Sequence, residues 1–165
     1  MQIKLEQARQ QDATALVALR AAVNQHLASK FGEGYWIAKL TERGALFAMR
    51  MSMVYVARDE NGLIATLALA KKKPWSIDKT YFTRSERPLY LLALAVHPRL
   101  QSNGIGTECI AQVRRIALAH PADAIRLDAY DTSAGAGDFY RKCGFSEVGR
   151  VTYRNVPLVY YEMLL

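Results

Sequence analysis

In the first part of the chain, segments whose apolar residues have the two-residue spacing of strands alternate with segments that have helical spacing. Alternation at residues 3–8 predicts a first strand, and Asp12 is placed to cap the helix that follows it. That helix carries apolar residues at helical spacing, namely Leu16, Leu19, Val23 and Leu27. Glycines at positions 32 and 34 end it, and a second helical stretch is expected over residues 35–51.

Two apolar runs on either side of a turn sequence predict a β-hairpin next. Residues 53–58 and 63–70 are strand-like, and Asn61-Gly62 between them is a favoured hairpin turn. A polar connection over residues 71–88 follows the hairpin. Connections of this length in a compact protein are more often functional than idle.

The second half of the chain alternates strands with helices. A strand at residues 91–96 precedes an amphipathic helix at 107–119, and Gly144 suits the left-handed cap of a later helix. The remaining predicted elements are a strand at 125–130, a helix at 133–143 and strands at 145–151 and 158–164. The order β-α-α-β-β-β-α-β-α-β-β predicts a single α/β domain over residues 1–165. We expect a mixed, mostly antiparallel sheet with a central parallel β-α-β unit and flanking helices.

Composition narrows the class of protein without naming a function. The 165 residues are 51% hydrophobic and 22% charged, as in ordinary globular proteins. No apolar run approaches the roughly 20 residues that cross a bilayer, and the N-terminal residues show no secretory signal. We therefore expect a cytoplasmic protein with no membrane partner. Cys109 and Cys143 lie among apolar neighbours, which favours buried thiols over a disulfide or a metal site.

The net charge of +7 permits a nucleic-acid partner but does not indicate one. The basic residues are scattered, and neither a helix–turn–helix signature nor a basic strand interleaved with aromatic residues is present. An anionic cofactor would account for part of the surplus. Nucleic acid is therefore not expected as the main partner.

The segment QSNGIG at residues 101–106 carries the clearest chemistry, because it joins the strand at 91–96 to a helix. The start of a helix leaves backbone N–H groups without intrahelical partners and has partial positive charge, so it favours phosphate oxygens. Gly104 and Gly106 lack side chains that would keep a pyrophosphate from the backbone. The spacing predicts an anion cradle.

Three kinds of phosphate loop compete for this segment. The nucleoside-triphosphate loop fails, because no lysine follows Gly106. The dinucleotide fingerprint is nearly met, and Asp128 lies about 20 residues on, where that motif has an acid. Against it, Cys109 replaces the third glycine and the turn after Val96 is long. The pattern Gln-x-x-Gly-x-Gly after Val-x-Pro matches throughout.

That third pattern resembles the acyl-CoA pyrophosphate loop of GCN5-related N-acetyltransferases (GNAT). The segment IRLDAYDTSAGAGDFYRKCGF, which starts at residue 125, is similar to the second half of the core of that family. The ending VYYEMLL is similar to small bacterial members. The close resemblance covers roughly residues 90–145. It implies a GNAT-like fold, acetyl-CoA as cofactor and transfer of an acetyl group to a primary amine by direct attack.

The resemblance also implies where acetyl-CoA binds. The pantetheine arm would lie along the strand that ends at Val96, bonded to the backbone of Leu94 and Val96, with an N–H near Leu94 or Ala95 for the thioester oxygen. The loop residues implied to bind the cofactor are Gln101, Ser102, Asn103, Gly104, Ile105, Gly106 and Thr107. Tyr140 is implied to be the general acid that protonates the leaving sulfur. The alternative is that Tyr140 is one more core aromatic residue.

Two departures from the family pattern concern catalysis. Ser133 stands where the family often has a cofactor-binding asparagine, and the strand before the loop has no glutamate. A primary amine has a pKa of about 10.4 and must lose a proton before it attacks. Candidates for that task are a chain of waters, His26, Glu33 or Asp128, and Asp128 could instead orient the acceptor or pair with an arginine. His97, in a turn before proline, is expected to cap the backbone or face solvent.

The acceptor pocket is expected in the segments that resemble the family least. The candidate residues for binding the acceptor are Tyr35, Trp36, Trp75, Tyr81, Asp128 and Tyr153. Aromatic rings there could hold an aliphatic or cationic amine, or could be core or dimer contacts. Small-molecule amines and protein amines remain open as acceptors, a homodimer is an option, and no metal is expected. The alternative function is an inactive acyl-CoA-binding sensor or interaction module.

Overall fold

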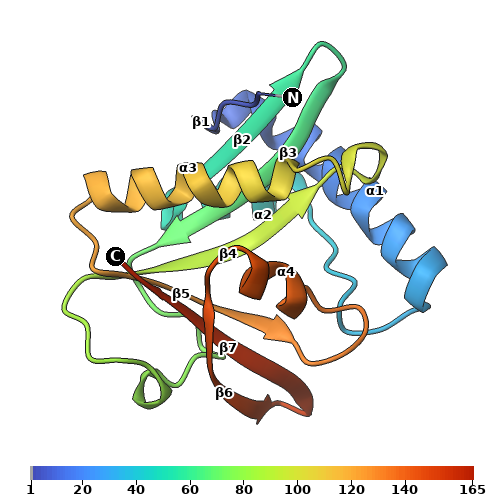
Figure 1. Cartoon of the computed structure of the whole chain (residues 1–165). Helices are drawn as coiled ribbons and strands as arrows, with labels where there is room; N and C mark the ends of the chain where they lie inside the picture. Colours follow the sequence, from blue (N-terminus) through green and yellow to red (C-terminus); the bar gives the residue numbers. More distant parts are fainter. Residues whose placement is uncertain (1) are drawn as a thin grey trace. The chain divides into compact units, whose positions relative to one another are not determined.

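The computed structural model describes residues 2–165, and its strands and α-helices follow the predicted order (Figure 1). The strands are β1 (Glu6–Gln7), β2 (Met53–Asp59), β3 (Gly62–Ala70), β4 (Pro88–Val96), β5 (Ala124–Tyr130), β6 (Ser146–Tyr153) and β7 (Val156–Leu164). The α-helices are α1 (Ala13–Phe31), α2 (Glu42–Met51), α3 (Ile105–Ala119) and α4 (Gly137–Lys142). Short 3-10 turns are η1 (Gln10–Asp12), η2 (Lys79–Tyr81) and η3 (Pro98–Leu100).

The strands form one mixed sheet in the order β1-β2-β3-β4-β5-β7-β6. The pairs β1–β2, β2–β3, β5–β7 and β6–β7 are antiparallel. β4 and β5 are parallel, paired from Pro88 with Ala124 to Tyr90 with Arg126, and α3 connects them. The predicted sheet with its central parallel β-α-β unit is therefore confirmed.

The chain folds as two compact units, each made of two stretches of sequence. Unit 1 comprises Met1–Ala70 and Leu92–Gln112, and unit 2 comprises Lys71–Leu91 and Val113–Leu165. The unit boundaries fall within β4 and within α3, so each of these elements contributes to both units. A single domain over residues 1–165 stays a prediction.

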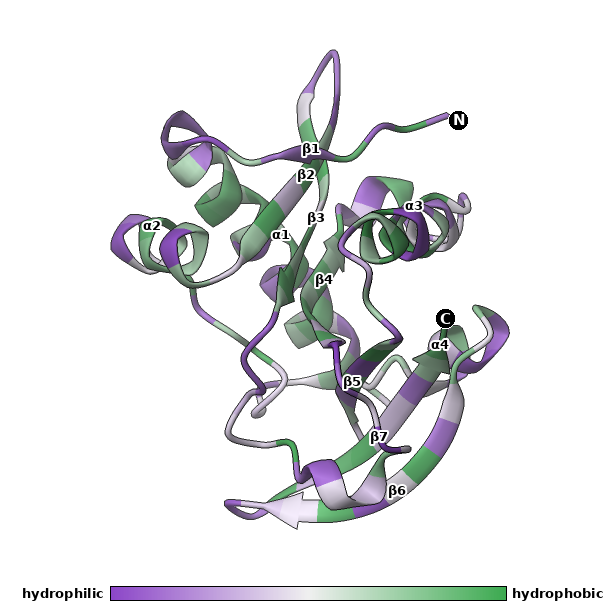
Figure 2. Ribbon diagram, turned by 90° about the vertical axis from the view of Figure 1, so that its left-hand side faces the viewer, coloured by the Kyte–Doolittle hydropathy of each residue, from purple (hydrophilic) through white to green (hydrophobic). Residues whose placement is uncertain are grey.

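The core of unit 1 lies between two helices and the β2–β3 hairpin. α1 packs on β3 and on α2, and α2 packs on β2. In Figure 2, β4 is hydrophobic along most of its length, while the tip of the β2–β3 hairpin is hydrophilic. The buried residues of this core are Ala13, Leu16, Leu19, Val23, Ala45, Val54, Val56, Leu63, Ala68 and Ala95. The helical spacing predicted for α1 thus identified its inner face, except that Leu27 is only partly buried.

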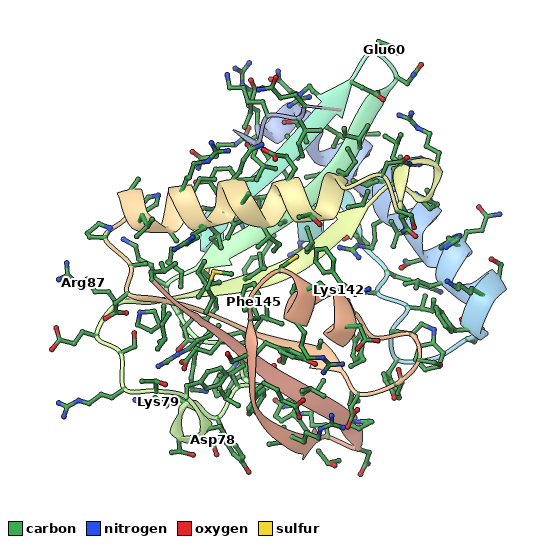
Figure 3. All side chains as sticks on the ribbon, in the orientation of Figure 1. Glu60, Asp78, Lys79, Arg87, Lys142 and Phe145 are labelled. Carbon is green, nitrogen blue, oxygen red and sulfur yellow. The ribbon has the colours of Figure 1, made fainter. Side chains whose placement is uncertain are left out.

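The predicted hairpin is confirmed, but its two-residue turn is Glu60-Asn61, because β2 ends at Asp59 and β3 begins at Gly62. The backbone N–H of Asn61 donates to Oδ1 of Asp59 (2.8 Å), and Gly62 has a φ of 118° that suits glycine. Glu60 stands at the tip of this hairpin in Figure 3.

The predicted first strand is mostly wrong, since only Glu6–Gln7 pairs with β2. The backbone before β1 is hydrogen-bonded to a side chain on α3 instead of to a strand. Oε1 of Gln112 accepts a hydrogen bond from the N–H of Leu5 (2.9 Å), and Nε2 of Gln112 donates to the carbonyl of Ile3 (2.8 Å). One amide side chain therefore bonds the backbone as a neighbouring strand would.

Asp12 precedes α1 as predicted, but its side chain does not cap that helix. Oδ2 accepts from the backbone N–H of Arg9 (2.8 Å), and the guanidinium of Arg58 donates to both carboxylate oxygens (3.1 and 3.3 Å). The carboxylate therefore joins the start of α1 to β2.

The helix predicted over residues 35–51 is wrong before residue 42. α2 begins at Glu42 after Thr41, whose Oγ1 accepts from the N–H of Gly44 (3.0 Å). In the preceding segment the indole of Trp36 folds back, and its Nε1 donates to the carbonyl of Gly32 (3.2 Å). A Cβ at Gly34 would lie 2.5 Å from this ring, so a larger residue there would displace the indole.

The helix predicted over residues 133–143 is shorter in the structure. α4 begins only at Gly137, because the preceding residues form a turn in which the N–H of Gly135 donates to the carbonyl of Thr132 (2.9 Å). A Cβ at Gly135 would lie 1.8 Å from the carbonyl oxygen of Tyr130. Gly144 follows the helix with a φ of 93°, the left-handed conformation that was predicted.

The core of unit 2 combines aromatic rings with a buried ion pair. Tyr160 lies 5.2 Å from Phe82 and 5.5 Å from Tyr81, measured between ring centroids. Arg126 on β5 and Glu162 on β7 are both 4% exposed. Phe145, labelled with Lys142 in Figure 3, is buried just beyond the end of α4.

Two further predictions concern the membrane and the cysteines. Within residues 2–165, no helix combines the length and the apolar character that crossing a membrane requires. Cys109 is buried, as predicted, whereas Cys143 is only half-buried, and the two form no disulfide in this part of the chain. Burial, with a smaller contribution from the charge of Glu108, raises the pKa of the Cys109 thiol to about 11.

Candidate active site

The connection after β4 is fixed to the β2–β3 hairpin of unit 1. The N–H of His97 donates to the carbonyl of Ile64 (2.8 Å), and Nδ1 of His97 accepts from the N–H of Arg99 (3.3 Å). Nη2 of Arg99 lies 2.9 Å from Oδ2 of Asp59 in an ion pair. His97 therefore caps the backbone, as one of its two predicted roles required.

Side chains of the predicted cofactor loop shape the loop itself. Nε2 of Gln101 donates to the carbonyl of Val96 (3.1 Å), and Nδ2 of Asn103 donates to the carbonyl of Gln101 (3.2 Å). The first bond closes the loop on the end of β4, and the second lies within the loop. Both amide side chains act locally, so the contacts they leave for a ligand are mainly those of the backbone.

The loop backbone has the geometry of an anion cradle. Ser102 and Gly104 have positive φ angles of 64° and 78°. The N–H of Glu108 donates to the carbonyl of Gly104 (3.0 Å), so the N–H groups of Ile105, Gly106 and Thr107 precede the first turn of hydrogen bonds in α3. Apart from Gly104 itself and its two chain neighbours, no described residue has an atom within 4 Å of a Cβ built at this position. The N-terminus of α3 can therefore hold a pyrophosphate against its backbone.

β4 is irregular in the part predicted to hold a pantetheine arm. Ala93 has a φ of 54°, which is unusual for a residue with a Cβ, and its carbonyl accepts from Nη2 of Arg20 on α1 (3.2 Å). Leu94 and Val96 are half-buried and Ala95 is buried. The ladder with β5 ends at Tyr90, so it does not include the backbone groups of these residues.

Tyr140 on α4 is buried in an aromatic cluster of unit 2. Its ring centroid lies 5.2 Å from that of Phe139, 5.7 Å from Phe145 and 6.0 Å from Tyr161. Burial raises the pKa of the Tyr140 phenol well above its usual range, and the nearby charge of Asp128 raises it further. Tyr140 therefore keeps its proton at neutral pH.

Asp128 on β5 is half-buried and lies opposite Tyr160 in the β5–β7 ladder. Ser76, in the long connection between β3 and β4, donates its Oγ–H to Oδ2 of Asp128. Burial raises the pKa of the Asp128 carboxyl, and the Ser76 hydrogen bond opposes that shift. Three roles were open for Asp128, and pairing with an arginine is wrong for residues 2–165, because the partner of this carboxylate is Ser76 and not an arginine.

The structure brings together only some of the predicted site residues. Asp128, Tyr140 and the serine missed by the sequence analysis, Ser76, belong to unit 2. Ser76 follows Trp75 in a connection already marked as functional by its length, but its partner is 52 residues away, so sequence gave no signal for the contact.

The remaining candidates named below lie in unit 1 or are exposed in unit 2. Tyr35 and Trp36 pack edge to face, 5.1 Å apart, in the α1–α2 connection of unit 1. His26 is half-buried and Glu33 is exposed in the same unit. Trp75 is 82% exposed. Ser133 and Tyr81, two further candidates in unit 2, are also exposed. Among residues 2–165, no three side chains of the metal-binding types form a cluster.

Comparison with known proteins agrees with this architecture. The model of the acetyltransferase (GNAT) family matches residues 7–145. No curated protein sequence matches the chain closely enough to count as a relative. A GNAT acetyltransferase from Listeria monocytogenes superposes with a TM-score of 0.77 at 15% identity, over 99% of this chain and 95% of the other.

Two similar structures contain the coenzyme. The PaiA N-acetyltransferase from Thermoplasma acidophilum, in complex with coenzyme A, has a TM-score of 0.74 at 16% identity and covers 100% of both chains. The acetyltransferase yncA from Salmonella typhimurium, with acetyl-CoA, has a TM-score of 0.67 at 16% identity, over 100% of this chain and 95% of the other. At these identities the likeness concerns the fold.

A mixed sheet with a helix that starts in an anion cradle after β4 is the fold that this chain shares with these coenzyme-bound structures. The match over most of its length shows that the chain belongs to the GNAT family of acetyltransferases. It is thus an N-acetyltransferase that uses acetyl-CoA and an amine acceptor. The backbone N–H groups after Gly104 fit the pyrophosphate of that cofactor.

Proposed function

We propose that the protein transfers the acetyl group to a primary amine by direct attack, with Tyr140 as general acid. The observation that carries this role is the burial of the Tyr140 phenol, which raises its pKa and keeps it protonated. A thiol has a pKa of about 8.5 and leaves as a thiolate that must accept a proton. Acetyl-CoA supplies the activated thioester, and Oη of Tyr140 holds the proton that the sulfur receives.

Asp128 is the general base in this proposal. An acceptor amine is mostly protonated at neutral pH, and β4 carries no acidic residue. Burial raises the pKa of the Asp128 carboxyl. Its charge is near enough to Tyr140 to raise the pKa of that phenol as well. The protonated amine first gives one proton to Asp128 and then attacks the thioester carbonyl. As the C–S bond breaks, Tyr140 gives its proton to the departing sulfur, and the second proton that the nitrogen sheds returns to the Tyr140 oxygen. Asp128 then releases its proton to solvent.

The cofactor is held by backbone rather than by charged side chains. The N–H groups at the start of α3 receive the pyrophosphate, and Gly104 lets it approach. The backbone of Leu94 and Val96 bonds the pantetheine arm, and an N–H at Leu94 or Ala95 receives the thioester oxygen. Ser133 replaces the asparagine of the family pattern with a shorter donor.

The charge of the β3–β4 connection favours an acceptor that also carries an anionic group. Residues 71–87 contain six basic and two acidic residues, so this segment supplies +4 of the net charge of +7. The same segment brings Ser76 to Asp128 and exposes Trp75 beside it. A field of this sign attracts amino acids or acidic peptides and repels polyamines and aminoglycosides.

The decisive experiment compares wild type with Tyr140→Phe in a thiol-release assay with acetyl-CoA and a panel of amines. We expect kcat to fall by about tenfold or more while acetyl-CoA affinity, measured by calorimetry, stays within about twofold. Tyr161→Phe is the matched control, because that neighbouring hydroxyl accepts a hydrogen bond from Arg141 (3.0 Å). Unchanged kcat in Tyr140→Phe would remove the general-acid role. Tight binding with no release from any amine in wild type would favour the sensor alternative.

A further inference from the structure

The β3–β4 connection is tied down at several points along its length. We call residues 71–87 the strap; Figure 3 labels three of its residues, Asp78, Lys79 and Arg87. Near its far end, Ser85 donates its Oγ–H to Oδ1 of Asp123, and the N–H groups of Glu86 and Arg87 also donate to that carboxylate (3.0 and 3.2 Å). The strap is therefore an ordered segment of unit 2 rather than a loose loop.

The middle of the strap is held by the buried ion pair. Nη2 of Arg126 donates to the carbonyl of Thr83 (2.6 Å), and the N–H of Thr83 donates to Oε1 of Glu162 (3.3 Å). The guanidinium of Arg126 also lies 5.0 Å from the ring centroid of Phe82, which is buried. Both backbone polar groups of Thr83 thus have charged, buried partners, which makes this the firmest anchor of the strap.

The near end of the strap is fixed around Ser76. The hydroxyl of Tyr160 donates to the backbone carbonyl of Ser76 and accepts from the N–H of Asp78 (3.0 Å). Ile77 between them is 1% exposed, and its N–H donates to the carbonyl of Pro74 (3.2 Å). The backbone of Ser76 therefore has a defined place relative to β7, and its side chain points at Asp128 on the neighbouring strand β5.

We propose that Ser76 is a positioning residue for the general base: its hydroxyl holds Oδ2 of Asp128 and leaves Oδ1 directed to the acceptor amine. The Ser76 hydrogen bond is made to Oδ2, so Oδ1 is the oxygen that this bond leaves for the acceptor. This inference rests on the proposed role of Asp128. It assigns to the strap the task of aiming that carboxylate, in addition to its charge.

Other groups around Asp128 do not supply this function. Tyr140 on α4 and Tyr160 on β7 are the titratable neighbours whose charge couples to Asp128, and both keep their protons at neutral pH because burial raises the pKa of each phenol. Within the described chain no lysine, arginine or histidine pairs with this carboxylate. Ser76 is therefore a neutral donor that stabilises the charged form of Asp128 against its burial.

The test is the pH dependence of kcat/KM for Ser76→Ala beside wild type. Loss of the hydroxyl removes a bond to the charged form, so the pKa of Asp128 rises and the acid limb of the profile moves to higher pH. We expect a shift of about one pH unit, which is about a tenfold loss of kcat/KM below the limb. Acetyl-CoA affinity should stay within about twofold, and Ser76→Thr, which keeps the hydroxyl, should restore the wild-type profile.

Ser85→Ala is the matched control, because it removes the same kind of serine–aspartate bond from the same strap, at Asp123 rather than at Asp128. Its pH profile should coincide with that of wild type. A Ser76→Ala profile that also coincides with wild type would overturn the positioning role. Asp128→Asn separates the two proposals: if that variant keeps full activity and an unchanged acid limb, the role of Asp128 as base fails. If it loses the limb while Ser76→Ala does not shift it, only the role of Ser76 fails.

Discussion

Arg126 and Glu162 are register partners across the β5–β7 ladder, and Nε of Arg126 lies 3.5 Å from Oε2 of Glu162. These two atoms form an ion pair without a hydrogen bond, and neither has a hydrogen-bond partner within residues 2–165. The other nitrogens of Arg126 donate to the hydroxyl of Tyr90 (3.2 Å) and to the carbonyl of Thr83 (2.6 Å). Because both side chains are almost fully buried, removing one charge leaves the other without compensation.

Glu162→Gln should therefore reduce the free energy of unfolding by about 3–5 kcal/mol, measured by urea denaturation at neutral pH. Glu6→Gln is the control, since the Lys4–Glu6 pair (3.4 Å) has side chains 82% and 47% exposed. Its loss should stay below about 1 kcal/mol. Equal losses in the two variants would show that burial does not govern the strength of the Arg126–Glu162 pair.

Gly104→Leu should lower the affinity for acetyl-CoA by roughly tenfold or more, because a side chain there would stand where the pyrophosphate meets the backbone. Gly32→Leu is the control for strain: both glycines have a φ of 78°, and at neither does a residue other than the chain neighbours lie within 4 Å of an added Cβ. Both variants should lose about 1–3 kcal/mol of stability from the positive φ, since the ψ of −176° at Gly32 is also nearly confined to glycine. Calorimetric titration with acetyl-CoA, beside NADH and ATP, would measure the difference, and equal affinity in the two variants would contradict the cradle.

Asp12→Asn should destabilise the protein in a pH-dependent way. Burial raises the pKa of the Asp12 carboxyl, but hydrogen bonds from Arg58 and from the N–H of Arg9 outweigh it, so the pKa in the folded state is lowered. A lowered folded pKa stabilises the protein above the unfolded pKa of about 3.9, and this contribution is lost as pH falls through the folded value. Urea unfolding should show a loss of about 1–2 kcal/mol at pH 7 that disappears near pH 2. A loss independent of pH would assign the effect to packing.

The charge of the strap should be visible in acceptor choice. Amines that carry a carboxylate should have lower KM values than polyamines, and the preference should shrink as salt rises from about 0.05 to 0.5 M. Lys72→Glu, in the strap, should reduce the preference, whereas Lys142→Glu, which makes the same charge change at the end of α4, should not. A preference for polyamines in wild type would refute the acceptor class proposed above.

Local patterns predicted the elements that local interactions decide. The β2–β3 hairpin follows from Asn61-Gly62 between two apolar runs, and the order of strands and helices follows from periodicity alone. The anion cradle was also predictable from sequence, because the spaced glycines and the start of the helix are adjacent along the chain. These features need no partner from elsewhere in the chain.

The errors arose where distant side chains or close packing decide the backbone. Gln112 bonds Ile3 and Leu5 across more than 100 residues, and this replaced a predicted strand. The turns at Gly34 and Gly135 depend on a folded indole and a nearby carbonyl that no periodicity reveals. Ser76 was missed for the same reason, since only the folded strap brings it to Asp128.

The division of the chain has a consequence for how it can be cut. The polypeptide passes between the two compact units three times, after Ala70, after Leu91 and after Gln112, and two of these passages lie inside β4 and α3. Neither unit is a continuous stretch, so limited proteolysis cannot release either of them as a single intact fragment. A nick within the strap would break one covalent connection and leave the other two, so both units would stay joined by the chain.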